Sequence, residues 1–525
     1  SSDINSLLNI TFKKEITPDL NGTLLVGNEL AEGSQRFWQQ DGTGFNIGGW
    51  HNLSNTTSQT VSESKFRNRT VGFYGNASFD YMRMLYLNIT GRNDIVSSMP
   101  AGSRSFFYPS VSLSWVFTEL EKLKENKVLS FGKVRASYAE VGQAGTYRSP
   151  YYIQYATTNG FLDDGIQFPF NGLSAYSPNT TLYSKGLKPQ NTKSVELGSE
   201  FKFFKGRVGL EYTYTHQTTV DQIFAVPLAG STGFAQEYRN AGKMSSDIHE
   251  IVLTLVPLKM KNFEWNMMVN FSKVINTCDE LAPGVESIYL GGFVDPQVRA
   301  YAGYSYPTIY GSTFLRDANG NIIVDDDPNS DYYGMPLKGG DGKIGEVTPK
   351  FLVGFNNSFK YKFITLSAQL DWKNGGQIYS GSNRLIDLYG VSERTADRTT
   401  PFIYQGVKSD GKPNDIVRGG AGDEIAYQTL YWTVLADISE AHIYETSYLK
   451  LREIALSFDL PSKILAPVRI KSASLSIFAR NILLWTTLPN FDPETSQGNG
   501  NMQGGFDYMS LPQTRSFGVG LNLVF

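Results

Sequence analysis

The chain has 525 residues and a formal net charge of -3. It therefore lacks the basic excess that nucleic-acid binding requires, and we expect no nucleic acid as a partner. Aromatic residues make up 13% of the chain, Gly reaches 51 and the only cysteine is Cys278, a composition that favours strands and turns and excludes an internal disulfide. No run of 18 or more apolar residues occurs, so the sequence predicts no transmembrane helix.

The first clear hairpin is predicted within residues 68–93. In "NRTVGFYGNASFDYMRMLYLNIT", apolar and polar residues alternate, and the alternation resumes after Met82 and Arg83. A period of two residues interrupted by a tight turn is typical of two antiparallel strands. The same pattern returns in "SVELGSEFKFFKGRVGLEYTYTHQTT", around residues 259–262, and in "FLVGFNNSFKYKFITLSAQLDW".

Taken in chain order, these patterns predict about fifteen strands, each with boundaries good to a few residues. The predicted strands are 5–16, 23–30, 68–81, 84–93, 106–118, 129–141, 194–204, 207–222, 239–257, 263–276, 349–360, 363–376, 445–458, 470–485 and 513–525.

Between the hairpins, long connections rich in Gly, Asn, Asp, Ser and Tyr are predicted. They cover roughly residues 31–66, 142–193, 277–348, 376–444 and 486–512. Structureless loops of this length are unusual in a compact soluble domain. Short turns at one end of the strands and long loops at the other are typical of an outer-membrane β-barrel. A β-sandwich would have short loops at both ends, so the loop asymmetry favours the barrel.

The closing strand "QTRSFGVGLNLVF" shows the same design. One face carries apolar side chains and the other carries Ser, Gly and Asn, as expected for a strand between lipid and a wet lumen. Because bacterial single-chain barrels have an even number of strands, a count of fifteen predicts that an early portion of the barrel is absent from this sequence. Alternating backwards from the last strand places Ser1 in or just after an extracellular loop.

Several stretches resemble, in order, the C-terminal half of the SusC/RagA family of TonB-dependent outer-membrane transporters. The matching stretches are "FYGNASFDYMRMLYLNITGR", "SRSFFYPSVSLSWVFTE", "LSFGKVRASYAEVGQAG", "GLKPQNTKSVELGSEFKFFKGRVGLEYTYTHQTTVDQI", "TPKFLVGFNNSFKYKFITLSAQLDWKNGGQIY", "SYLKLREIALSFDLP" and "FARNILLWTTLPNFDPET". The resemblance spans nearly the whole chain.

The resemblance implies an all-β transmembrane barrel of about 22 antiparallel strands with long extracellular loops and short periplasmic turns. Residues 1–525 would be the C-terminal part of that barrel, with the plug and the first strands not present in this sequence. It further implies outer-membrane import of glycan oligomers or oligopeptides together with a SusD-like surface lipoprotein, driven by the TonB complex through the missing N-terminal part. The alternative interpretation is a passive porin or surface-adhesin barrel without energy coupling.

No catalytic constellation is recognised, so we expect no enzymatic activity and no cofactor. The histidines His51, His216, His249 and His442 show no metal or nucleophile motif. Acidic residues in "RDANGNIIVDDDPNSD" lack the last ligand of a calcium loop. Where many members of the resembled family have an acidic "DxNGDG" stretch, this chain reads "LKGGDGKIGEV", so a calcium-like role for Asp341 is not expected.

Loop aromatics are the remaining candidates for ligand or lid contacts, since aromatic faces stack on sugars and peptides and their polar atoms add a hydrogen bond. Packing within the loops, or against the lipoprotein, is the competing explanation. The candidates are Trp38, Trp50, Tyr147, Tyr151, Tyr152, Tyr155, Phe161 and Phe168. By resemblance, the terminal Phe525 is expected to be the signal read by the barrel-assembly machinery.

Overall fold

The computed structural model describes residues 1–145, 153–155, 176–178, 180–423, 430–461, 465, 467, 470–497 and 504–524. The chain divides into two compact units. Unit 1 contains Ser1–Trp115, Arg135–Val195 and Thr219–Gly242, and unit 2 contains Val116–Val134, Glu196–Thr218 and Lys243–Phe525. None of the helices in the described ranges is both long and apolar enough to cross a membrane.

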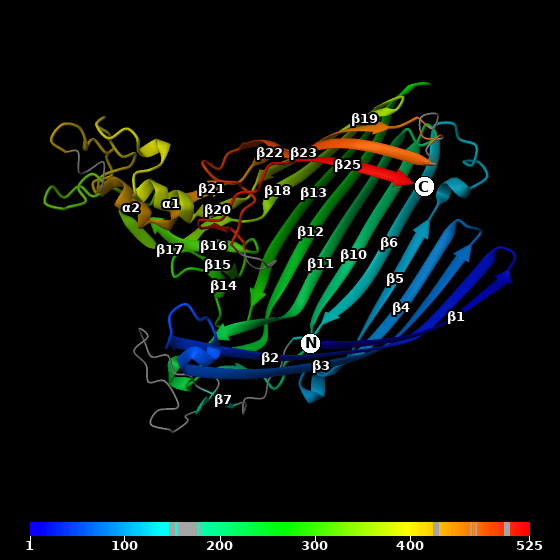
Figure 1. Ribbon diagram of the computed structural model, residues 1–525, viewed down its shortest axis with the longest axis horizontal. Coiled ribbons are helices and arrows are strands. Elements are labelled where there is room, and N and C mark those ends of the chain that lie inside the picture. Colours follow the sequence, from blue (N-terminus) through cyan, green and yellow to red (C-terminus); the bar gives the residue numbers. More distant parts are fainter. Residues whose placement is uncertain are drawn as a thin grey trace. The chain divides into compact units, whose positions relative to one another are not determined.

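One large sheet accounts for most of the strands (Figure 1). In the order in which neighbours hydrogen-bond, it contains β1 (Ser2–Thr17), β2 (Leu20–Phe45), β3 (Thr56–Tyr81), β4 (Leu85–Val96), β5 (Ser105–Trp115), β6 (Leu129–Gln143), β10 (Gln190–Phe203), β11 (Val208–Pro227), β12 (Gln236–Lys259), β13 (Phe263–Leu281), β18 (Pro349–Tyr361), β19 (Ile364–Gly375), β22 (Tyr448–Asp459), β23 (Ser472–Thr486) and β25 (Ser516–Val524). A sixteenth strand, β9 (Thr181–Tyr183), pairs in parallel with β12. The fifteen predicted strands are all present in the predicted order, which confirms the all-β prediction.

The hairpin of β2 and β3 is much longer than predicted. Residues 31–66 were expected to be a loop, but β2 runs to Phe45, and the pairing of the two strands continues as far as Phe45 and Thr56. This part of the sequence is mostly polar, and its few large apolar residues, such as the neighbours Phe37 and Trp38, do not alternate with polar ones. The pairing is instead propagated through backbone hydrogen bonds from the well-patterned part of the hairpin.

The predicted tight turns are confirmed where the strands reverse. Met82 and Arg83, between β3 and β4, have φ values of 52° and 54°. Positive φ at two consecutive residues is the geometry of the turns whose twist matches that of a hairpin. Neither residue is glycine, so the pairing of the long strands imposes this conformation on them.

In unit 2 the apolar residues of neighbouring strands lie in register. One row runs across six strands through Trp265, Phe359, Leu366, Leu456, Ile477 and Val519. A nearby row on the other face runs through Met268, Asn356, Gln369, Glu453, Arg480 and Ser516. Arg480 and Glu453 form an ion pair of 2.7 Å within that polar row. The sheet in unit 2 therefore has one apolar face and one mostly polar face, on which Met268 and Leu352 also lie.

Unit 1 repeats this arrangement across β1 to β5. An apolar row contains Phe12, Leu24, Ala77, Ile89 and Val111. The adjacent row on the opposite face contains Lys13, Thr23, Ser78, Asn88 and Ser112. Ile89 remains 47% exposed and Leu24 48% exposed, so the apolar face is not covered by protein in the described structure.

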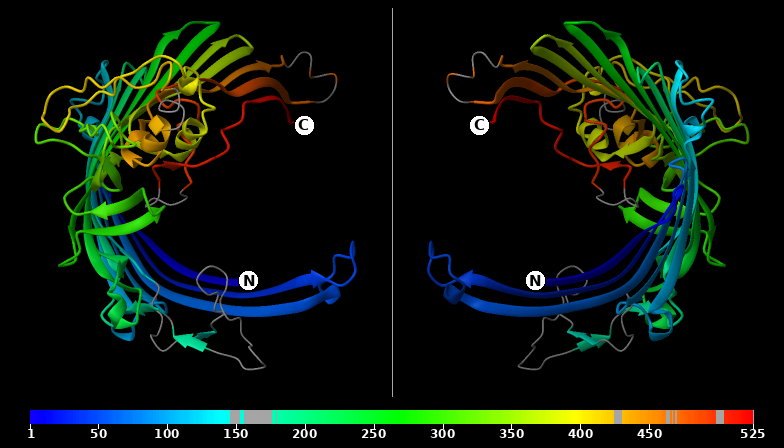
Figure 2. Two further views of the ribbon diagram at one scale, coloured as in Figure 1. Left: turned by 90° about the vertical axis from the view of Figure 1, so that its left-hand side faces the viewer. Right: turned by 90° about the vertical axis from the view of Figure 1, so that its right-hand side faces the viewer.

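The long connections of unit 2 fold into small sheets and helices, which Figure 2 shows gathered beside one another. They contain β14 (Ser287–Gly292), β15 (Gln297–Tyr301), β16 (Thr308–Phe314), β17 (Lys338–Glu346), β20 (Gln377–Ser380), α1 (Gly381–Leu388), α2 (Trp432–Ala436), β21 (Ile443–Glu445) and β24 (Phe506–Asp507). In unit 1, β7 (Ile153–Tyr155) pairs with β8 (Tyr176–Pro178). Residues 277–348 and 376–444, predicted as structureless loops, are thus substantially ordered.

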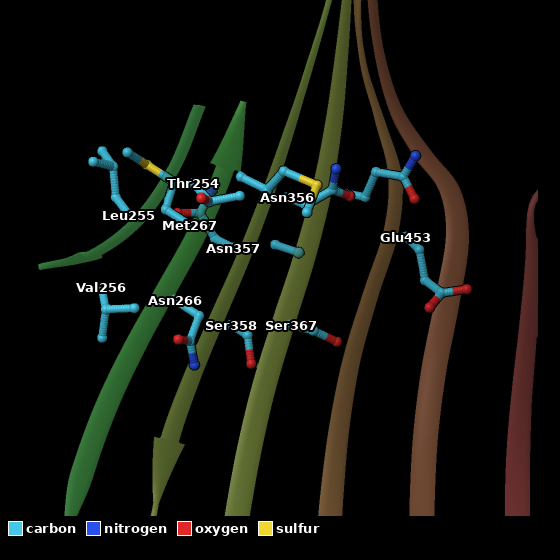
Figure 3. Close-up of a pocket in the computed structure, with 13 residues that line it drawn as sticks. Thr254, Leu255, Val256, Asn266, Met267, Asn356, Asn357, Ser358, Ser367 and Glu453 are labelled. Carbon is cyan, nitrogen blue, oxygen red and sulfur yellow. The ribbon is translucent and has the colours of Figure 1, made fainter. Parts of the chain in front are cut away.

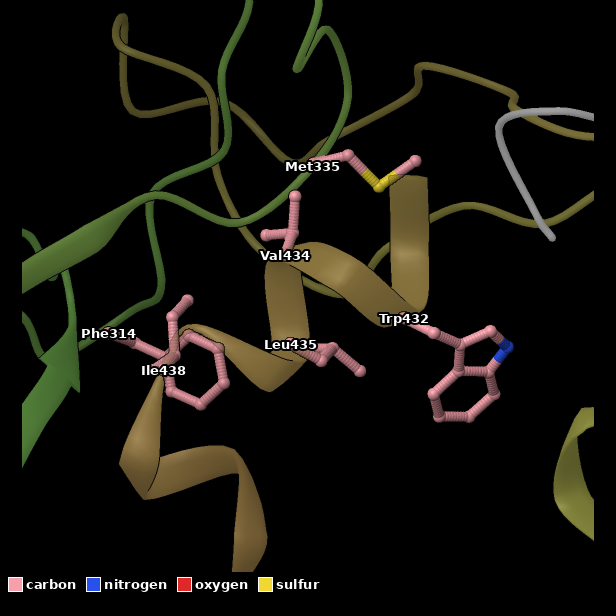
Figure 4. Close-up of a cluster of buried hydrophobic side chains, with 6 residues drawn as sticks. All are labelled: Phe314, Met335, Trp432, Val434, Leu435 and Ile438. Atoms are coloured by element: carbon pink, nitrogen blue, oxygen red, sulfur yellow. The ribbon is translucent and has the colours of Figure 1, made fainter. Parts of the chain in front are cut away.

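Two apolar clusters stabilise these small elements of unit 2. One contains Phe314, Met335, Trp432, Val434, Leu435 and Ile438 and joins β16 to α2 (Figure 4). The other contains Val298, Ile309, Ile344, Tyr379 and Phe506 and joins the sheet β14–β17 to β20 and β24. Burial of these side chains gives the loop segments a core of their own, separate from the faces of the large sheet.

Candidate binding site in the loop segments

Helix α1 is held in place by buried polar contacts at its start. The hydroxyl of Ser380 accepts a hydrogen bond from the backbone N–H of Asn383 at 3.2 Å and donates one to Asp507 at 2.9 Å. All three side chains are no more than 1% exposed. A capped helix start with an additional buried bond has a fixed position, so side chains projecting from α1 are well oriented.

A cavity of about 990 Å³ lies beside α1. It is bordered by β14 and the segment after it, by β20 and α1, and by residues near the C-terminal end of α2. Its lining includes the aromatic residues Tyr289, Phe293, Tyr379 and Tyr508 and the charged residues Asp295, Lys338, Arg384 and Asp437. Aromatic and charged groups thus line the same cavity, as in sites that bind an amphipathic small molecule.

A second cavity of about 480 Å³ has a more apolar lining. Lys338, Arg384, Ala436 and Asp437 line both cavities. The remaining lining residues are Tyr332, Pro336, Leu337, Leu388, Thr433, Val434 and Ile438. Figure 4 shows Val434 and Ile438 on the helical segment that forms part of this wall. The two cavities adjoin one another at Arg384 and Lys338.

The carboxylate of Asp295 is fixed by three neighbours. Its Oδ1 accepts hydrogen bonds from the backbone N–H of Ser312 at 3.0 Å and the hydroxyl of Ser439 at 2.8 Å. Lys338 lies 3.9 Å from its Oδ2 and 3.4 Å from a carboxylate oxygen of Asp437. The positive charge of Lys338 is therefore already balanced by two carboxylates.

Arg384 differs from Lys338, because most of its donors are unused. Its Nε donates to the carbonyl oxygen of Ala436 at 2.5 Å. Among the residues that the structure describes, neither terminal guanidinium nitrogen has a hydrogen-bond partner. A guanidinium anchored at Nε and open at its two terminal nitrogens can receive a carboxylate in the bidentate geometry that Arg favours.

Tyr379 is a nearly buried aromatic residue in the lining of the larger cavity. Its side chain is 5% exposed, and burial raises the pKa of its phenol to about 12. The phenol therefore stays protonated over the physiological pH range. Phe293 lies beside Tyr508 with ring centroids 5.3 Å apart, so aromatic surface continues along the cavity.

A smaller cavity of about 440 Å³ lies on the large sheet of unit 2 (Figure 3). Much of its lining comes from the polar face: Asn266, Asn356, Ser358, Ser367, Gln369 and Glu453. Beside these amides, hydroxyls and one carboxylate, apolar side chains also line the cavity: Leu255, Val256, Met267, Met268 and Ala368. No concentration of aromatic side chains lines it, so it offers less specific recognition than the cavities beside α1.

A buried ionic network joins β22 to the segment that follows β23. The ammonium of Lys450, whose side chain is 2% exposed, lies 2.8 Å from Glu494 and 3.4 Å from Asp492. Arg452 bonds both Asp371, at 2.6 Å, and Glu494. Burial acts to raise the pKa of Glu494, but hydrogen bonds from Arg452 and Lys450 outweigh burial and lower that pKa to about 2. Glu494 is therefore ionised at any physiological pH.

Two of the aromatic residues proposed from sequence have described side chains. Trp38 lies in β2 and not in a loop, is 60% exposed and has the guanidinium of Arg36 4.4 Å from its ring centroid. Trp50 lies in the connection between β2 and β3 and is 50% exposed. The side chain of Tyr155, in β7, is not described, and Tyr147, Tyr151, Tyr152, Phe161, Phe168 and Phe525 lie outside the described residues. Their role in binding stays a prediction.

The sequence alone did not identify the cavity. Lys338 belongs to the stretch "LKGGDGKIGEV", which departs from the acidic stretch of the resembled family and for which no binding role was expected, and Arg384 lies in a segment predicted as a loop. The one local signal was Ser380, a favourable helix N-cap followed by "GSNRLIDL". Nothing in the sequence indicated that this helix would lie beside residues near positions 295 and 437.

Comparisons with known proteins agree on one family. A family model described as "TonB dependent receptor-like, beta-barrel" matches residues 3–403. TonB-dependent receptor P3 of Formosa agariphila is 25% identical over 493 residues, covering 89% of this chain and 47% of the relative. TonB-dependent receptor SusC of Bacteroides thetaiotaomicron is 22% identical over 479 residues, covering 87% of this chain and 44% of the relative.

Among solved structures, one described as the RagAB peptide transporter matches with a TM-score of 0.78 and 18% identity over 99% of this chain and 55% of that one. The RagAB peptide importer in an open-open state matches with a TM-score of 0.75 and 19% identity. At these identities the likeness shows a shared fold. The chain spans about half the length of the curated relatives it matches.

Proposed function

Because the chain belongs to the TonB dependent receptor-like β-barrel family, whose members lie in the outer membrane, we propose that it forms wall and outer loops of an energy-coupled nutrient importer. The observation that carries the proposal is the pair of in-register rows in unit 2, one apolar across six strands and one polar across five of them. An apolar outer face against lipid and a polar inner face toward a lumen are what a transmembrane barrel requires.

The exposed apolar side chains support the same placement. Ile477 is 51% exposed and Val519 is 70% exposed, which would be unfavourable for a whole sheet face in water. Against hydrocarbon the same exposure is favourable. Each strand then needs a partner on both sides, because unpaired backbone groups are not tolerated in lipid.

The end strands β1 and β25 have a partner on one side in the described sheet. The matched relatives are about twice as long as the matched region. We infer that residues 1–525 form the C-terminal part of the barrel. The first strands of the whole importer would close the barrel between β1 and β25, and a plug would fill its lumen. The same upstream part would contact TonB, and the importer would work with a SusD-like lipoprotein at the cell surface.

Glycan oligomers and oligopeptides are the two proposed classes of cargo. The ordered loop segments with their cavities would make the first contact with cargo, and the polar face of the sheet would form the path inward. Import in this form involves no covalent chemistry, so we propose no enzymatic role. The exposed Trp38 and Trp50 remain proposed contacts for cargo or lipoprotein, and Phe525 remains a proposed assembly signal.

The test uses the bacterium that encodes the full-length protein. Deleting the gene is expected to abolish uptake of either a fluorescent peptide pool or a fluorescent glycan pool while leaving the other unaffected, and the restored gene should return it. If uptake of both pools is unchanged by the deletion, the import function is wrong. Intact-mass analysis of the purified complex should show additional polypeptide sufficient for a plug; an isolated fifteen-strand chain would contradict the proposed organisation.

A further inference from the structure

Two positively charged side chains line the cavities beside α1, and they differ in how far neighbouring groups already pair with them. Lys338 is balanced by Asp437 at 3.4 Å and by Asp295 at 3.9 Å. Arg384 is anchored only through Nε, at 2.5 Å from the carbonyl oxygen of Ala436. Its side chain lines both the 990 Å³ and the 480 Å³ cavity. The fold thus presents one positioned guanidinium at the junction of two cavities.

We propose that this junction binds the terminal carboxylate of an oligopeptide, with Arg384 as the anchor; the proposal rests on the import function proposed above and names its cargo. A carboxylate is the planar anion that matches a guanidinium with two open nitrogens. The N-cap bond at Ser380 and the bond to Ala436 hold that guanidinium before a ligand arrives, which reduces the entropy lost on binding.

The smaller cavity accommodates the last side chain of the peptide. Leu337, Leu388, Val434 and Ile438 give it apolar walls, and it begins at the same arginine that holds the carboxylate. An apolar C-terminal residue, such as leucine, buries its side chain there with a favourable transfer free energy. The pairing of one cation with one apolar cavity therefore selects for a free C-terminus on an apolar residue.

The larger cavity accommodates the preceding residues. β14 is the end strand of the sheet β14–β17, and its residues Tyr289 and Gly292 line this cavity. An extended peptide can add to such an edge through main-chain hydrogen bonds that do not depend on its sequence. Tyr289, Phe293 and Tyr508 supply aromatic surface for its side chains.

The charge balance of the lining favours a peptide over an acidic glycan. Asp295 and Asp437 offset Lys338 and Arg384, so the two cavities together are close to neutral. A polyuronate carries a carboxylate on every ring and would place some of them against the two aspartates, which is unfavourable. A peptide with one terminal carboxylate meets Arg384 alone, and its amide N–H groups can donate to the aspartates.

The experiment uses the full-length protein purified with its native partners in detergent. It is incubated with an equimolar pool of tetrapeptides that have randomised first three positions and a C-terminal leucine, half as free acids and half as C-terminal amides. Bound peptides are counted by mass spectrometry. Wild-type protein is expected to enrich free acids at least tenfold over amides, Arg384→Gln to lose this preference and Arg384→Lys to retain part of it.

Lys412→Gln is the matched control, because Lys412 is exposed, pairs with the exposed Asp410 at 2.7 Å and lines neither cavity. It should enrich free acids as the wild type does. Equal binding of acids and amides by wild type, or no binding of either, overturns the proposal. Binding of digalacturonate that Arg384→Gln abolishes, without peptide binding, would assign the site to acidic glycans instead.

Failure of this site and failure of import are separated by a second readout. If Arg384→Gln cells take up the fluorescent peptide pool at the wild-type rate while the gene deletion does not, import stands and the anchor role of Arg384 is wrong. If the deletion itself leaves uptake unchanged, the import function fails irrespective of Arg384.

Discussion

The ammonium of Lys450 and the carboxylate of Glu494 lie 2.8 Å apart in a site where the lysine side chain is 2% exposed. The bond joins β22 to the segment after β23, and the same carboxylate also receives Arg452. A buried lysine without a partner is very unfavourable, so this contact fixes the position of the segment that contains residues 488–495 against the wall.

Glu494→Gln should destabilise the folded protein, because it leaves Lys450 and Arg452 with less negative charge in a poorly hydrated site. We expect a loss of about 3 kcal/mol in unfolding free energy, at the lower end for breaking a buried ion pair. The measurement is a urea titration of the reconstituted full-length protein, in which the shift of the folded band in unheated gels reports unfolding.

Glu121→Gln is the control for that substitution, because Glu121 is exposed and its change should leave the midpoint unaltered. If Glu494→Gln and Glu121→Gln unfold at the same urea concentration, the network contributes nothing to stability. The structural role given to Glu494 would then be wrong.

His442 should make the loop segments of unit 2 sensitive to acid. Its side chain is fully buried, and burial lowers its pKa from 6.5 to about 4, with the positive charge of Arg394 acting in the same direction. Because the folded pKa is below the unfolded one, the stability from neutral His442 is complete above pH 6.5 and is lost as the pH falls to about 4. The unfolding free energy lost over this pH range is about 3 kcal/mol, at 1.36 kcal/mol per pKa unit.

Hydrogen exchange of residues 430–445, measured between pH 4 and pH 7 and corrected for intrinsic rates, tests this behaviour. Wild-type protection should decrease toward pH 4, whereas His442→Gln should show a flatter profile at whatever absolute level it starts. Identical pH profiles for the two proteins would show that His442 does not titrate in the way its burial implies.

Phe355 and Asn356 are neighbours in β18 on opposite faces of the sheet. Phe355 pairs with Val269 and Leu370, and Asn356 pairs with Met268 and Gln369. Phe355→Arg should impair membrane insertion, because an arginine facing lipid costs about 2–4 kcal/mol near the middle of the bilayer. Asn356→Arg should insert normally, since its side chain enters the wet lumen.

Membrane insertion of both variants is measured as the fraction of folded protein in purified outer membranes, with the two variants expressed at the same level. Equal insertion of the two variants would contradict the assignment of faces. Greater loss with Asn356→Arg would reverse the assignment.

Cys278 should be unreactive in the native protein. Its side chain is 0% exposed, and a thiol must ionise and be reached to react. A maleimide should label the urea-unfolded chain at Cys278 and leave the folded chain unlabelled, while Lys412→Cys labels in both states. Rapid labelling of folded wild type would show that this part of β13 opens to solvent.

The strands of the large sheet were predictable because each repeats a period of two residues over a length that spans a bilayer. Trp265, Phe359 and Leu366 show why this works: each lies on an apolar face that lipid requires. The register of Phe359 with Leu366 follows from the short turn between β18 and β19, whereas Trp265 and Phe359 pair across strands that a long connection separates. The family resemblance added the barrel and the outer membrane, and the match over residues 3–403 confirms both.

The candidate cavity could not be predicted, because it depends on contacts between distant segments. Arg384 and Ala436 are joined by one hydrogen bond across more than fifty positions, and no local pattern in either segment encodes the other. The extension of β2 to Phe45 was missed for a related reason, since its polar side chains follow a register that is set elsewhere in the hairpin.

Uptake measured with and without a protonophore, in cells that express the full-length protein as their sole route for the imported pool, tests the import function most directly. An energy-coupled importer predicts that the protonophore abolishes uptake and that the purified protein gives no steady conductance in planar bilayers. Uptake that continues without a proton gradient, together with a stable open conductance, would contradict energy coupling and identify a passive porin.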